Sequence, residues 1–359
     1  MAVHFHSLKI KDVRKETADC VSVCFDVPDE LLAEFHFREG QNITLKKTIA
    51  GQEIRRSYSI CAAPHEKQLR VAIKRVGGGI FSQFANEELR SGDELEVLPP
   101  TGKFNARLNN SETGNYLAIA AGSGITPIIS IIKHTLQYQP NSSFTLIYSN
   151  RNRSSIIFFE ELEALKNRYI RRFNFINLLS REKTDSEIFY GRIDEPKLSA
   201  LGKLVSYKSF DEIYLCGPEA MIFAANDFLE KKGINKKNIH FELFNTPGQI
   251  PGKKITEAFN EVNLGPKSNI TIKLDGRSFG FDLPYKGTSI LDGALQQGAD
   301  LPYACKGGVC ATCRAKLVEG QVEMDVNYAL EPEEIEQGFI LTCQSHPKTE
   351  KVFVDFDIK

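Results

Sequence analysis

No apolar run in this 359-residue sequence approaches the length of a transmembrane helix, and residues 1–12 lack the apolar core of a signal peptide. We therefore expect a cytoplasmic protein with no membrane partner. The formal net charge of -1 argues against binding to nucleic acid. The nucleophile elbow G-x-S-x-G and the zinc motif H-E-x-x-H are absent, and the seven histidines show no metal-ligand spacing. These absences argue against a hydrolase built on either motif.

The eight cysteines carry most of the information. In a reducing cytoplasm they need not form disulfides. Four of them lie near the end of the sequence as Cys305-x4-Cys310-x2-Cys313, with Cys343 further on. This is the plant-type spacing of 2Fe-2S cluster ligands, in which a tight loop supplies three thiolates and a distant strand end supplies the fourth. The others are too scattered to form a second ligand set: Cys20, Cys24, Cys61 and Cys216.

A structural zinc site made from the same four cysteines is the alternative. Such zinc sites usually pair two Cys-x2–4-Cys knuckles, whereas Cys343 stands alone and the gap from Cys305 to Cys310 is wide for a knuckle. The loop also contains Gly307 and Gly308, which would let backbone N–H groups approach the sulfurs of a cluster. The spacing therefore favours iron and sulfur over zinc.

Hydrophobic periodicity divides the chain into three domains and a linker. Residues 1–108 contain many short alternating strands and one helix, which predicts an antiparallel β-barrel. In residues 109–245 five apolar runs alternate with helical stretches, which predicts an α/β domain with a parallel five-stranded sheet. Residues 246–266 are punctuated by proline and glycine and predict a linker. The remaining residues, 267–359, mix strands and short helices around the cysteine loop, which predicts an α+β domain.

One strand of the barrel is predicted in more detail. Residues 20–27 alternate apolar and other residues, the pattern of a strand with one face in the core. That alternation places Cys20 and Cys24 on the opposite face.

The predicted barrel contains two segments suited to a flavin nucleotide. At a strand end lies Arg56-Ser57-Tyr58-Ser59. An arginine fork can hold a pyrophosphate, a tyrosine can lie against a flat ring, and a serine hydroxyl can bond to a ring nitrogen. Further on, Lys74 is followed by glycines 77–79 before a helix start, where bare N–H groups favour an anion. A chance surface strand and an ordinary helix cap are the respective alternatives.

The second domain opens with the features of a dinucleotide site. A buried strand leads to Gly122-Ser123-Gly124 and then to a helix with Pro127 near its start. This arrangement places a pyrophosphate at a helix N-terminus, although Pro127 stands where the third glycine of the full fingerprint would fall. A glycine turn without a phosphate role is the alternative.

Two later segments are candidates for contacts with the rest of the nucleotide, namely its ribose and its nicotinamide. After the next strand the chain reads Tyr148-Ser149-Asn150-Arg151, without the acidic residue that favours NADH, so we expect NADPH in preference to NADH. The fourth strand ends in Cys216, where a thiol could contact a nicotinamide; a buried structural cysteine is the alternative.

These motifs, in this order, resemble the ferredoxin–NADP reductase superfamily with a fused C-terminal plant-type ferredoxin. The likeness covers essentially the whole chain and rests on RRSYSIC, AIAAGSGITP, FNTPG, SILDGALQQGADLPYACKGGVCATC and VFVDFD. More narrowly, the chain resembles the reductase components of phenylacetyl-CoA epoxidases, which are multicomponent di-iron oxygenases. The sequence departs from many relatives in having Ala121-Gly122-Ser123-Gly124 where they show Gly-Gly-Thr-Gly.

The resemblance implies a fold and a set of site residues. The third domain would be a β-grasp-like ferredoxin domain. Ser59 would lie near the reactive flavin nitrogen and Cys216 near the nicotinamide, as the catalytic pair. Thr126 would also approach the flavin, Arg151 would approach the 2′-phosphate, and Phe244 would shield the flavin face. The cofactor-binding residues would be Arg56, Ser57, Tyr58, Ser59, Ile73, Lys74, Gly79, Phe81, Ser82, Gly122, Ser123, Gly124, Thr126, Pro127, Arg151, Cys216, Gly217, Pro218, Met221 and Phe244, with Cys305, Cys310, Cys313 and Cys343 on the metal.

The predicted function is an NADPH-dependent electron-transfer reductase. FAD would take two electrons as a hydride, and the 2Fe-2S cluster would pass them singly to the di-iron oxygenase component, with no nucleic acid or membrane involved. A reductase for another hydroxylase or a desaturase is the nearest alternative. A non-enzymatic redox sensor or a zinc-stapled interaction protein is the alternative of a different class.

Overall fold

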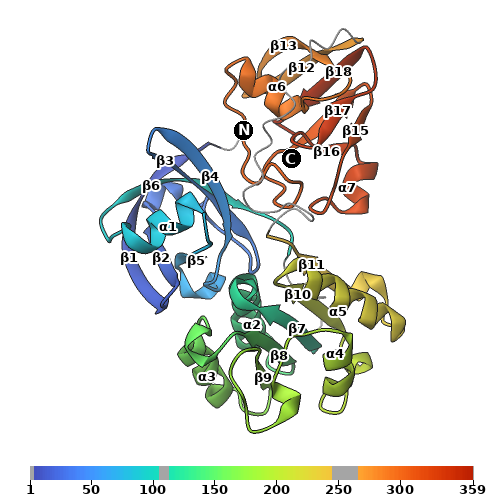
Figure 1. The fold of residues 1–359 in the computed structure, drawn as a ribbon. Coiled ribbons are helices and arrows are strands. Elements are labelled where there is room, and N and C mark those ends of the chain that lie inside the picture. Colours follow the sequence, from blue (N-terminus) through green and yellow to red (C-terminus); the bar gives the residue numbers. More distant parts are fainter. Residues whose placement is uncertain (1–3, 105–112, 245–265, 359) are drawn as a thin grey trace.

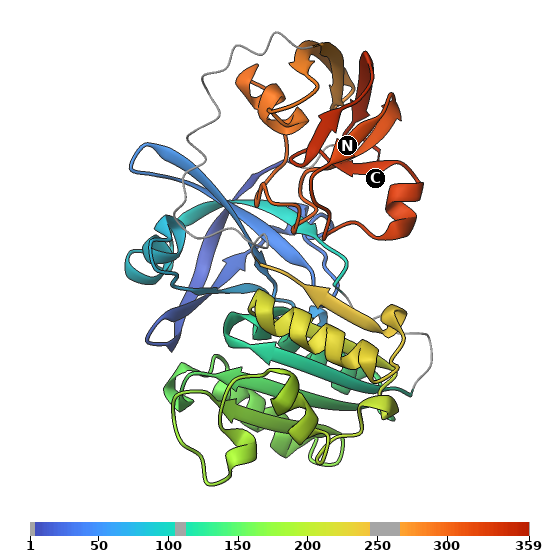
Figure 2. The same ribbon diagram turned by 45° about the vertical axis from the view of Figure 1, so that its right-hand side comes forward.

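The computed structural model describes residues 4–104, 113–244 and 266–358, which form three domains (Figures 1 and 2). In Figure 1 the blue barrel lies to the left, the orange and red third domain at the top and the green and yellow α/β domain at the bottom, and Val309 and Tyr328 of the third domain pack on the α/β domain. Within these residues, no helix has the length and apolar character needed to cross a membrane. The predicted domain limit at 108 and nearly all of the predicted linker lie outside the described residues, so these limits stay predictions.

The first domain is the predicted antiparallel barrel. Its six strands are ordered β4-β3-β6-β1-β2-β5, and an isolated bridge between Ile60 and Val71 connects the chain after β4 to β5. The helix α1 (Ile80–Glu87) buries Phe81 and Ala85 in the barrel core. The strands are β1 (His6–Thr17), β2 (Cys20–Asp26), β3 (Asn42–Ile49), β4 (Gln52–Ser59), β5 (Leu69–Lys74) and β6 (Glu94–Thr101).

The strand β2 corrects one sequence expectation. Alternation predicts a single buried face, but both faces are buried. Val21, Val23 and Phe25 lie in the barrel core, whereas Cys20 belongs to a core that consists mainly of α/β-domain residues. The α/β domain covers the outer face of β2 at Cys20, whereas Ser22 on the same face is covered by Glu16 and Arg70 of the barrel itself. Periodicity within one strand carries no signal for such a contact.

The second domain is an α/β domain with the parallel strand order β11-β10-β7-β8-β9. Alternate residues of β7 enter two different cores, one shared with α2 and α3 and the other with α4 and α5, so helices cover both faces of the sheet. The short helix α4 was not expected from the sequence. The elements are β7 (Asn115–Ala121), α2 (Ile125–Tyr138), β8 (Ser143–Asn150), α3 (Phe159–Arg168), β9 (Phe173–Leu179), α4 (Glu195–Leu201), β10 (Glu212–Cys216), α5 (Glu219–Lys231) and β11 (Ile239–Glu242).

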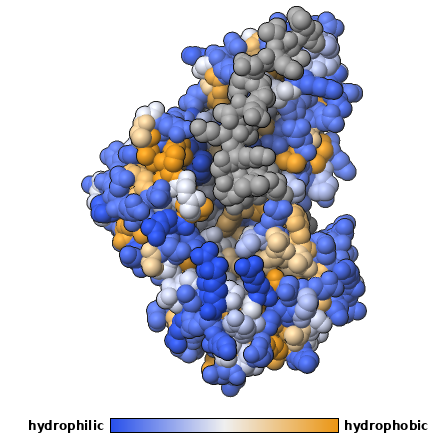
Figure 3. Space-filling model, in the orientation of Figure 1, coloured by the Kyte–Doolittle hydropathy of each residue, from blue (hydrophilic) through white to orange (hydrophobic). Residues whose placement is uncertain are grey.

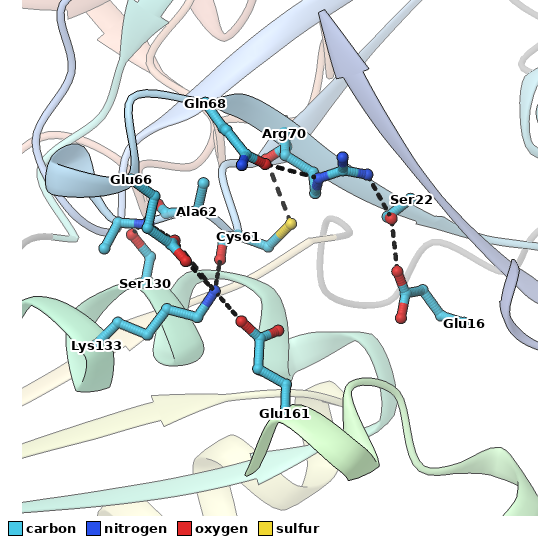
Figure 4. Close-up of polar contacts among 11 residues, drawn as sticks. Glu16, Ser22, Cys61, Ala62, Glu66, Gln68, Arg70, Ser130, Lys133 and Glu161 are labelled. Carbon is cyan, nitrogen blue, oxygen red and sulfur yellow. Dashed lines mark hydrogen bonds and ion pairs between the residues drawn. The ribbon is translucent and has the colours of Figure 1, made fainter. Parts of the chain in front are cut away.

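A buried lysine connects the first two domains (Figure 4). Lys133 on α2 reaches the barrel, where its ammonium donates to the Cys61 carbonyl at 3.3 Å and pairs with Glu66 at 3.2 Å. It also pairs with Glu161 of its own domain at 2.5 Å. Burial alone would lower the pKa of Lys133, but the two carboxylates outweigh it and raise that pKa. The charge is therefore retained in the interface, which fixes the two domains against each other.

The third domain has a five-stranded mixed sheet of order β13-β12-β18-β14-β16 and a small β15-β17 pair. Asp275 and Gly276 form the predicted hairpin turn between β12 and β13. The short strands β15, β16 and β17 were not expected from the sequence. The elements are β12 (Lys267–Leu274), β13 (Arg277–Pro284), α6 (Ile290–Gln296), β14 (Arg314–Glu319), β15 (Val322–Met324), α7 (Pro332–Glu336), β16 (Phe339–Leu341), β17 (Ser345–Pro347) and β18 (Lys351–Asp355).

Candidate active site and iron–sulfur centre

The strand β4 presents different residues on its two faces. Tyr58 packs against Phe81 of α1, with ring centroids 5.8 Å apart, and burial raises the pKa of its hydroxyl. Arg56 is exposed on the same face of the strand. Ser57 and Ser59 share the opposite face, and Ser59 is almost fully buried. An ionised tyrosine is thus disfavoured at this site, and Tyr58 offers a neutral aromatic surface.

The glycine segment before α1 leaves its backbone accessible. A Cβ atom added at Gly77 or Gly78 would meet nothing within 4 Å. Ser82 is instead committed to the turn itself, because its hydroxyl accepts from the Val76 amide at 3.1 Å and donates to the Gly79 carbonyl at 3.0 Å. Figure 3 shows apolar residues over the barrel in the region of α1, where Val76 and Ile80 are half-exposed. The Gly79 amide donates to the Val76 carbonyl at 3.0 Å, so the open backbone at Gly77 and Gly78, beside this apolar surface, is the part that suits a flavin nucleotide.

The turn after β7 lies where the strand order reverses, between β7 and β10, the usual ligand position of an open α/β sheet. Gly122 has a φ of +54°, and Gly124 packs on the end of β10: a Cβ atom there would lie 2.1 Å from the Cys216 carbonyl oxygen. The Thr126 hydroxyl donates to the Ser123 carbonyl at 3.0 Å. The sequence requires glycine here because backbone meets backbone.

The predicted nucleotide residues after β10 also form one close contact. A Cβ atom added at Gly217 would lie 2.7 Å from Cε of Met221, and Pro218 is the N-cap residue of α5.

On the barrel side, the ammonium of Lys74, which follows the buried Ile73, would be 3.8 Å from a Cβ atom at Gly122. The two predicted nucleotide segments therefore face each other across the domain boundary, with Pro127 buried in the first turn of α2.

The ends of three strands place a thiol beside a carboxyl group. Cys216 pairs in register with Ala120 on one side and with Glu242 on the other. The Ser59 hydroxyl of the barrel donates to Glu242 Oε2 at 3.1 Å. Burial, and next the charge of Glu242, raise the pKa of Cys216, so this thiol is neutral. Sequence reasoning missed Glu242; the signal available was a carboxylate in the last strand of a parallel sheet.

The carboxyl group of Glu242 is itself perturbed. Glu242 keeps some exposed surface as a residue, yet protein surrounds its carboxyl group, and this burial raises its pKa from 4.5 to about 8. The hydrogen bond from Ser59 acts in the opposite direction, and the nearby Cys310 acts in the same direction as burial. Near neutral pH this group holds a proton next to the Ser59 hydroxyl.

Replacing Glu242 with glutamine is expected to flatten the dependence of stability on pH. A raised native pKa means that the native state binds the proton more tightly than the unfolded chain does. The contribution of Glu242 to the free energy of unfolding is therefore complete below about pH 4 and is lost as pH rises toward 8. The variant should match the wild-type melting temperature at about pH 4 and exceed it at pH 8. Thermal unfolding across this range, with Glu319→Gln on the exposed end of β14 as control, measures the effect. Parallel curves for Glu242→Gln and wild type would contradict it.

Three exposed arginines follow the ends of β8 and β9, where the 2′-phosphate is predicted to bind. Arg151 is exposed after β8, and its carbonyl accepts from the Arg181 amide at 2.8 Å, which brings a second exposed arginine beside it. Arg153 lies 4.9 Å over the ring of Phe159. Sequence reasoning assigned a role only to Arg151, because Arg181 follows a different strand. Phe244 is 37% exposed and is the last described residue before the predicted linker.

The four predicted metal ligands come together as two pairs of thiols. Cys305 hydrogen-bonds to Cys310, which raises the pKa of the first and lowers that of the second. Cys313 and Cys343 form an equivalent pair. Cys310 also interacts electrostatically with Cys313 and Cys343. The loop reaches this shape through left-handed backbone at Lys306, Gly308 and Ala311.

The arrangement fits a two-iron cluster. Two thiol pairs offer two ligands to each of two irons. Donors to sulfur are also present: the Gly307 amide lies 3.3 Å from Cys305 Sγ, and Gln344 Nε2 lies 3.6 Å from Cys343 Sγ. Such hydrogen bonds stabilise cluster thiolates.

Comparisons with known proteins identify a family for each of the three domains. Residues 7–106 match the oxidoreductase FAD-binding domain, residues 118–227 match the oxidoreductase NAD-binding domain, and residues 272–348 match the 2Fe-2S iron-sulfur cluster binding domain. The chain is an NAD(P)H-dependent oxidoreductase that belongs to the ferredoxin–NADP reductase superfamily, in the group with a C-terminal plant-type 2Fe-2S ferredoxin domain.

Two relatives match nearly the whole length of the chain. It is 46% identical to a subunit of the 1,2-phenylacetyl-CoA epoxidase of Escherichia coli (strain K12), over 99% of this chain and 98% of the relative. It is 34% identical to the ferredoxin reductase component of 3-ketosteroid-9-alpha-monooxygenase of Rhodococcus rhodochrous, over 97% and 96%. The predicted resemblance is confirmed.

Solved structures confirm the fold. Phthalate dioxygenase reductase matches with a TM-score of 0.60 at 22% identity, covering 98% of each chain. The FAD/NAD-binding domain of nitric oxide dioxygenase from Vibrio cholerae matches with a TM-score of 0.58 at 24% identity, covering 67% of this chain and 99% of that one. The three-domain architecture predicted from the sequence is therefore correct.

Proposed function

We propose that the protein takes electrons from NADPH and delivers them singly to a separate oxygenase component. When bound, FAD supplies storage for the two electrons of a hydride and the 2Fe-2S cluster supplies one-electron transfer. The observation that carries this proposal is the position of Glu242, which accepts from Ser59 on the flavin strand and interacts electrostatically with the cluster ligand Cys310. The predicted flavin and cluster sites thus lie on either side of one side chain.

The position of each residue in the fold indicates which cofactor it would contact. Tyr58 and Arg56 would hold the flavin ring and its pyrophosphate, and Lys74 would serve both nucleotides where the two glycine segments meet. Ser59 would orient the flavin, with its proton supply at Glu242. Cys216, neutral and buried, would pack against the nicotinamide rather than react with it. The lysine-linked interface between the first two domains would keep these groups in register.

The acceptor we propose is the di-iron oxygenase component of a phenylacetyl-CoA epoxidase. The relative at 46% identity over nearly its full length supports this choice. The 3-ketosteroid monooxygenase reductase at 34% identity supports the broader alternative of another oxygenase. Reduction of each purified oxygenase by NADPH through this protein would separate the two, since only the true acceptor should turn over with its substrate. A cytoplasmic location stays a prediction.

The nucleotide preference depends on arginine side chains. Replacing Arg151 with alanine is expected to raise KM for NADPH by about tenfold, because a charge-assisted hydrogen bond to the 2′-phosphate is lost. KM for NADH should change less than about twofold, because that cofactor has no such phosphate. Steady-state reduction of ferricyanide with both cofactors measures the difference. Equal changes for NADH and NADPH would place the 2′-phosphate elsewhere.

The alternative of a redox sensor or zinc-stapled protein makes a different prediction. It requires no bound FAD and no oxidation of NADPH. The absorbance spectrum of anaerobically purified protein decides between them, because flavin and 2Fe-2S bands together support the reductase.

A further inference from the structure

The face of β4 that carries Ser57 and Ser59 also carries Arg55, a residue with no role in the cofactor sites described above. Arg55 is almost fully buried although it is charged. Its guanidinium donates to the Leu301 carbonyl at 3.1 Å and to Asp300 Oδ1 at 2.9 Å. Both acceptors belong to the ferredoxin domain, just before the cluster loop. One side chain of the flavin barrel therefore reaches across to the chain that leads into the cluster.

The surroundings of Arg55 hold it in this direction. Its guanidinium lies between two aromatic rings, 4.3 Å from the ring centre of Tyr303 in the ferredoxin domain and 4.9 Å from that of Phe5 in the barrel. The Arg55 Nε donates a hydrogen bond to Glu53 Oε1 at 2.8 Å. Burial would lower the pKa of Arg55, but the hydrogen bonds to Asp300 and Glu53 outweigh it and raise that pKa. A planar fork that meets two aromatic rings and three acceptors is a fixed contact, which lysine cannot reproduce.

A second contact on the same face reaches the cluster loop itself. Thr44 of β3 pairs in register with Ser57, and their hydroxyl oxygens are 3.0 Å apart. The Thr44 hydroxyl is also 3.4 Å from that of Thr312, which lies between the ligands Cys310 and Cys313 and hydrogen-bonds to Cys310. The docked domain thus places the cluster loop against β3, next to β4, the strand predicted to bind flavin.

We propose that Arg55 is the positioning residue that holds the ferredoxin domain on the flavin barrel, so that the cluster loop stays next to the flavin strand β4. This inference rests on the proposed function, because its purpose is transfer between the two cofactors. Distance governs such transfer, so a domain that leaves this contact loses rate even if both cofactors remain bound. The Arg55 guanidinium bonds to Glu53, Asp300 and Leu301, none of which is a predicted cofactor ligand.

The test uses the full chain with its cofactors bound and the variants Arg55→Met, Arg55→Lys and Asp300→Asn. Arg14→Met is the control, because Arg14 is an exposed barrel arginine that pairs with Asp12 at 2.7 Å, away from the ferredoxin domain. Stopped-flow mixing with NADPH separates flavin reduction from the later reduction of the cluster. In Arg55→Met, flavin reduction should keep its rate, while cluster reduction should slow by about tenfold or more. Arg55→Lys should recover only part of that loss.

A structural readout independent of turnover accompanies the kinetics. Backbone amide exchange of residues 300–304 and 311–313, the ferredoxin-domain segments that contact the barrel, should become about tenfold faster in Arg55→Met, with no change in the core strands of either domain. Asp300 is 77% exposed, so Asp300→Asn should fold normally and should show a smaller increase in the same segments. Unchanged exchange in both Arg55→Met and Asp300→Asn would overturn the proposal, as would slower flavin reduction equal to the slower cluster reduction. If wild type transfers no electrons to its cluster, the proposed function fails while the exchange result still decides whether Arg55 docks the domain.

Discussion

Replacement of Cys310 by serine is expected to abolish electron transfer through the cluster while leaving flavin reduction by NADPH intact. Cys310 is buried, pairs with Cys305 and interacts electrostatically with the other two ligands, so its loss removes the central thiolate of the set. Iron content should fall below stoichiometry, and transfer to the oxygenase should drop by roughly 100-fold or more. Metal analysis and stopped-flow absorbance measure the two effects separately.

The matched control for this variant is Cys24→Ser. Cys24 is equally buried but lies on β2 of the barrel, where its thiol faces the Phe25 carbonyl at 3.8 Å, a contact a serine hydroxyl can replace. This control should keep its iron and its rates. Simultaneous loss of flavin reduction and cluster transfer in Cys310→Ser would argue that the two cofactor sites are not separate modules.

Replacement of Gly124 by alanine is expected to slow flavin reduction by NADPH by about 100-fold, because an added Cβ atom would overlap the backbone of β10. The new atom would lie 2.1 Å from the Cys216 carbonyl oxygen and 2.7 Å from the Gly217 amide nitrogen. The turn and the strand end must separate, which displaces the nucleotide site by a distance that reaction geometry does not tolerate. Such overpacking should also cost about 1–3 kcal/mol of stability. Pre-steady-state kinetics and thermal unfolding measure both effects.

The control for the glycine variant lies in the ferredoxin domain. In Gly280→Ala the added atom would meet its nearest neighbour, the Ile270 carbonyl oxygen, at an ordinary 3.5 Å. Its flavin reduction should equal that of wild type. A Gly124→Ala protein with normal kinetics and normal stability would show that the turn can move without consequence, and would remove the structural reason for glycine at this position.

Regular elements of the fold could be predicted because their periodicity is local. The runs 173–179 and 314–319 match β9 and β14 to the residue, since each is an apolar or alternating segment with clear turns on both sides. The helix α4 and the three-residue strands β15, β16 and β17 were missed. They are too short to show a period, and they form because neighbouring strands or helices cover them.

The candidate site was predictable where a motif lies within one loop. The cysteine loop and the two glycine turns can each be recognised from a few consecutive residues, because the residue types and their spacing indicate the group that binds there. Glu242 and Arg55 gave no such signal, because each acts across a domain boundary on Ser59 or Asp300, far away in the sequence. Ser82 shows the opposite case, since its place in a glycine loop suggested a ligand, whereas its hydroxyl is used to hold the turn.

The core that Cys20, Cys61 and Ala72 share with the α/β domain has a consequence for how this protein could be taken apart. These barrel residues are buried among apolar side chains of α2 and β7, so a cut between the first two domains would expose a hydrophobic surface on each half. The ferredoxin domain has a core drawn entirely from its own residues and meets the barrel largely through polar groups. Val309 and Tyr328 of this domain pack on the core of the α/β domain, so recombination should exchange the cluster-bearing unit only where these few docking contacts are kept, whereas the two nucleotide-binding units are inherited as a pair.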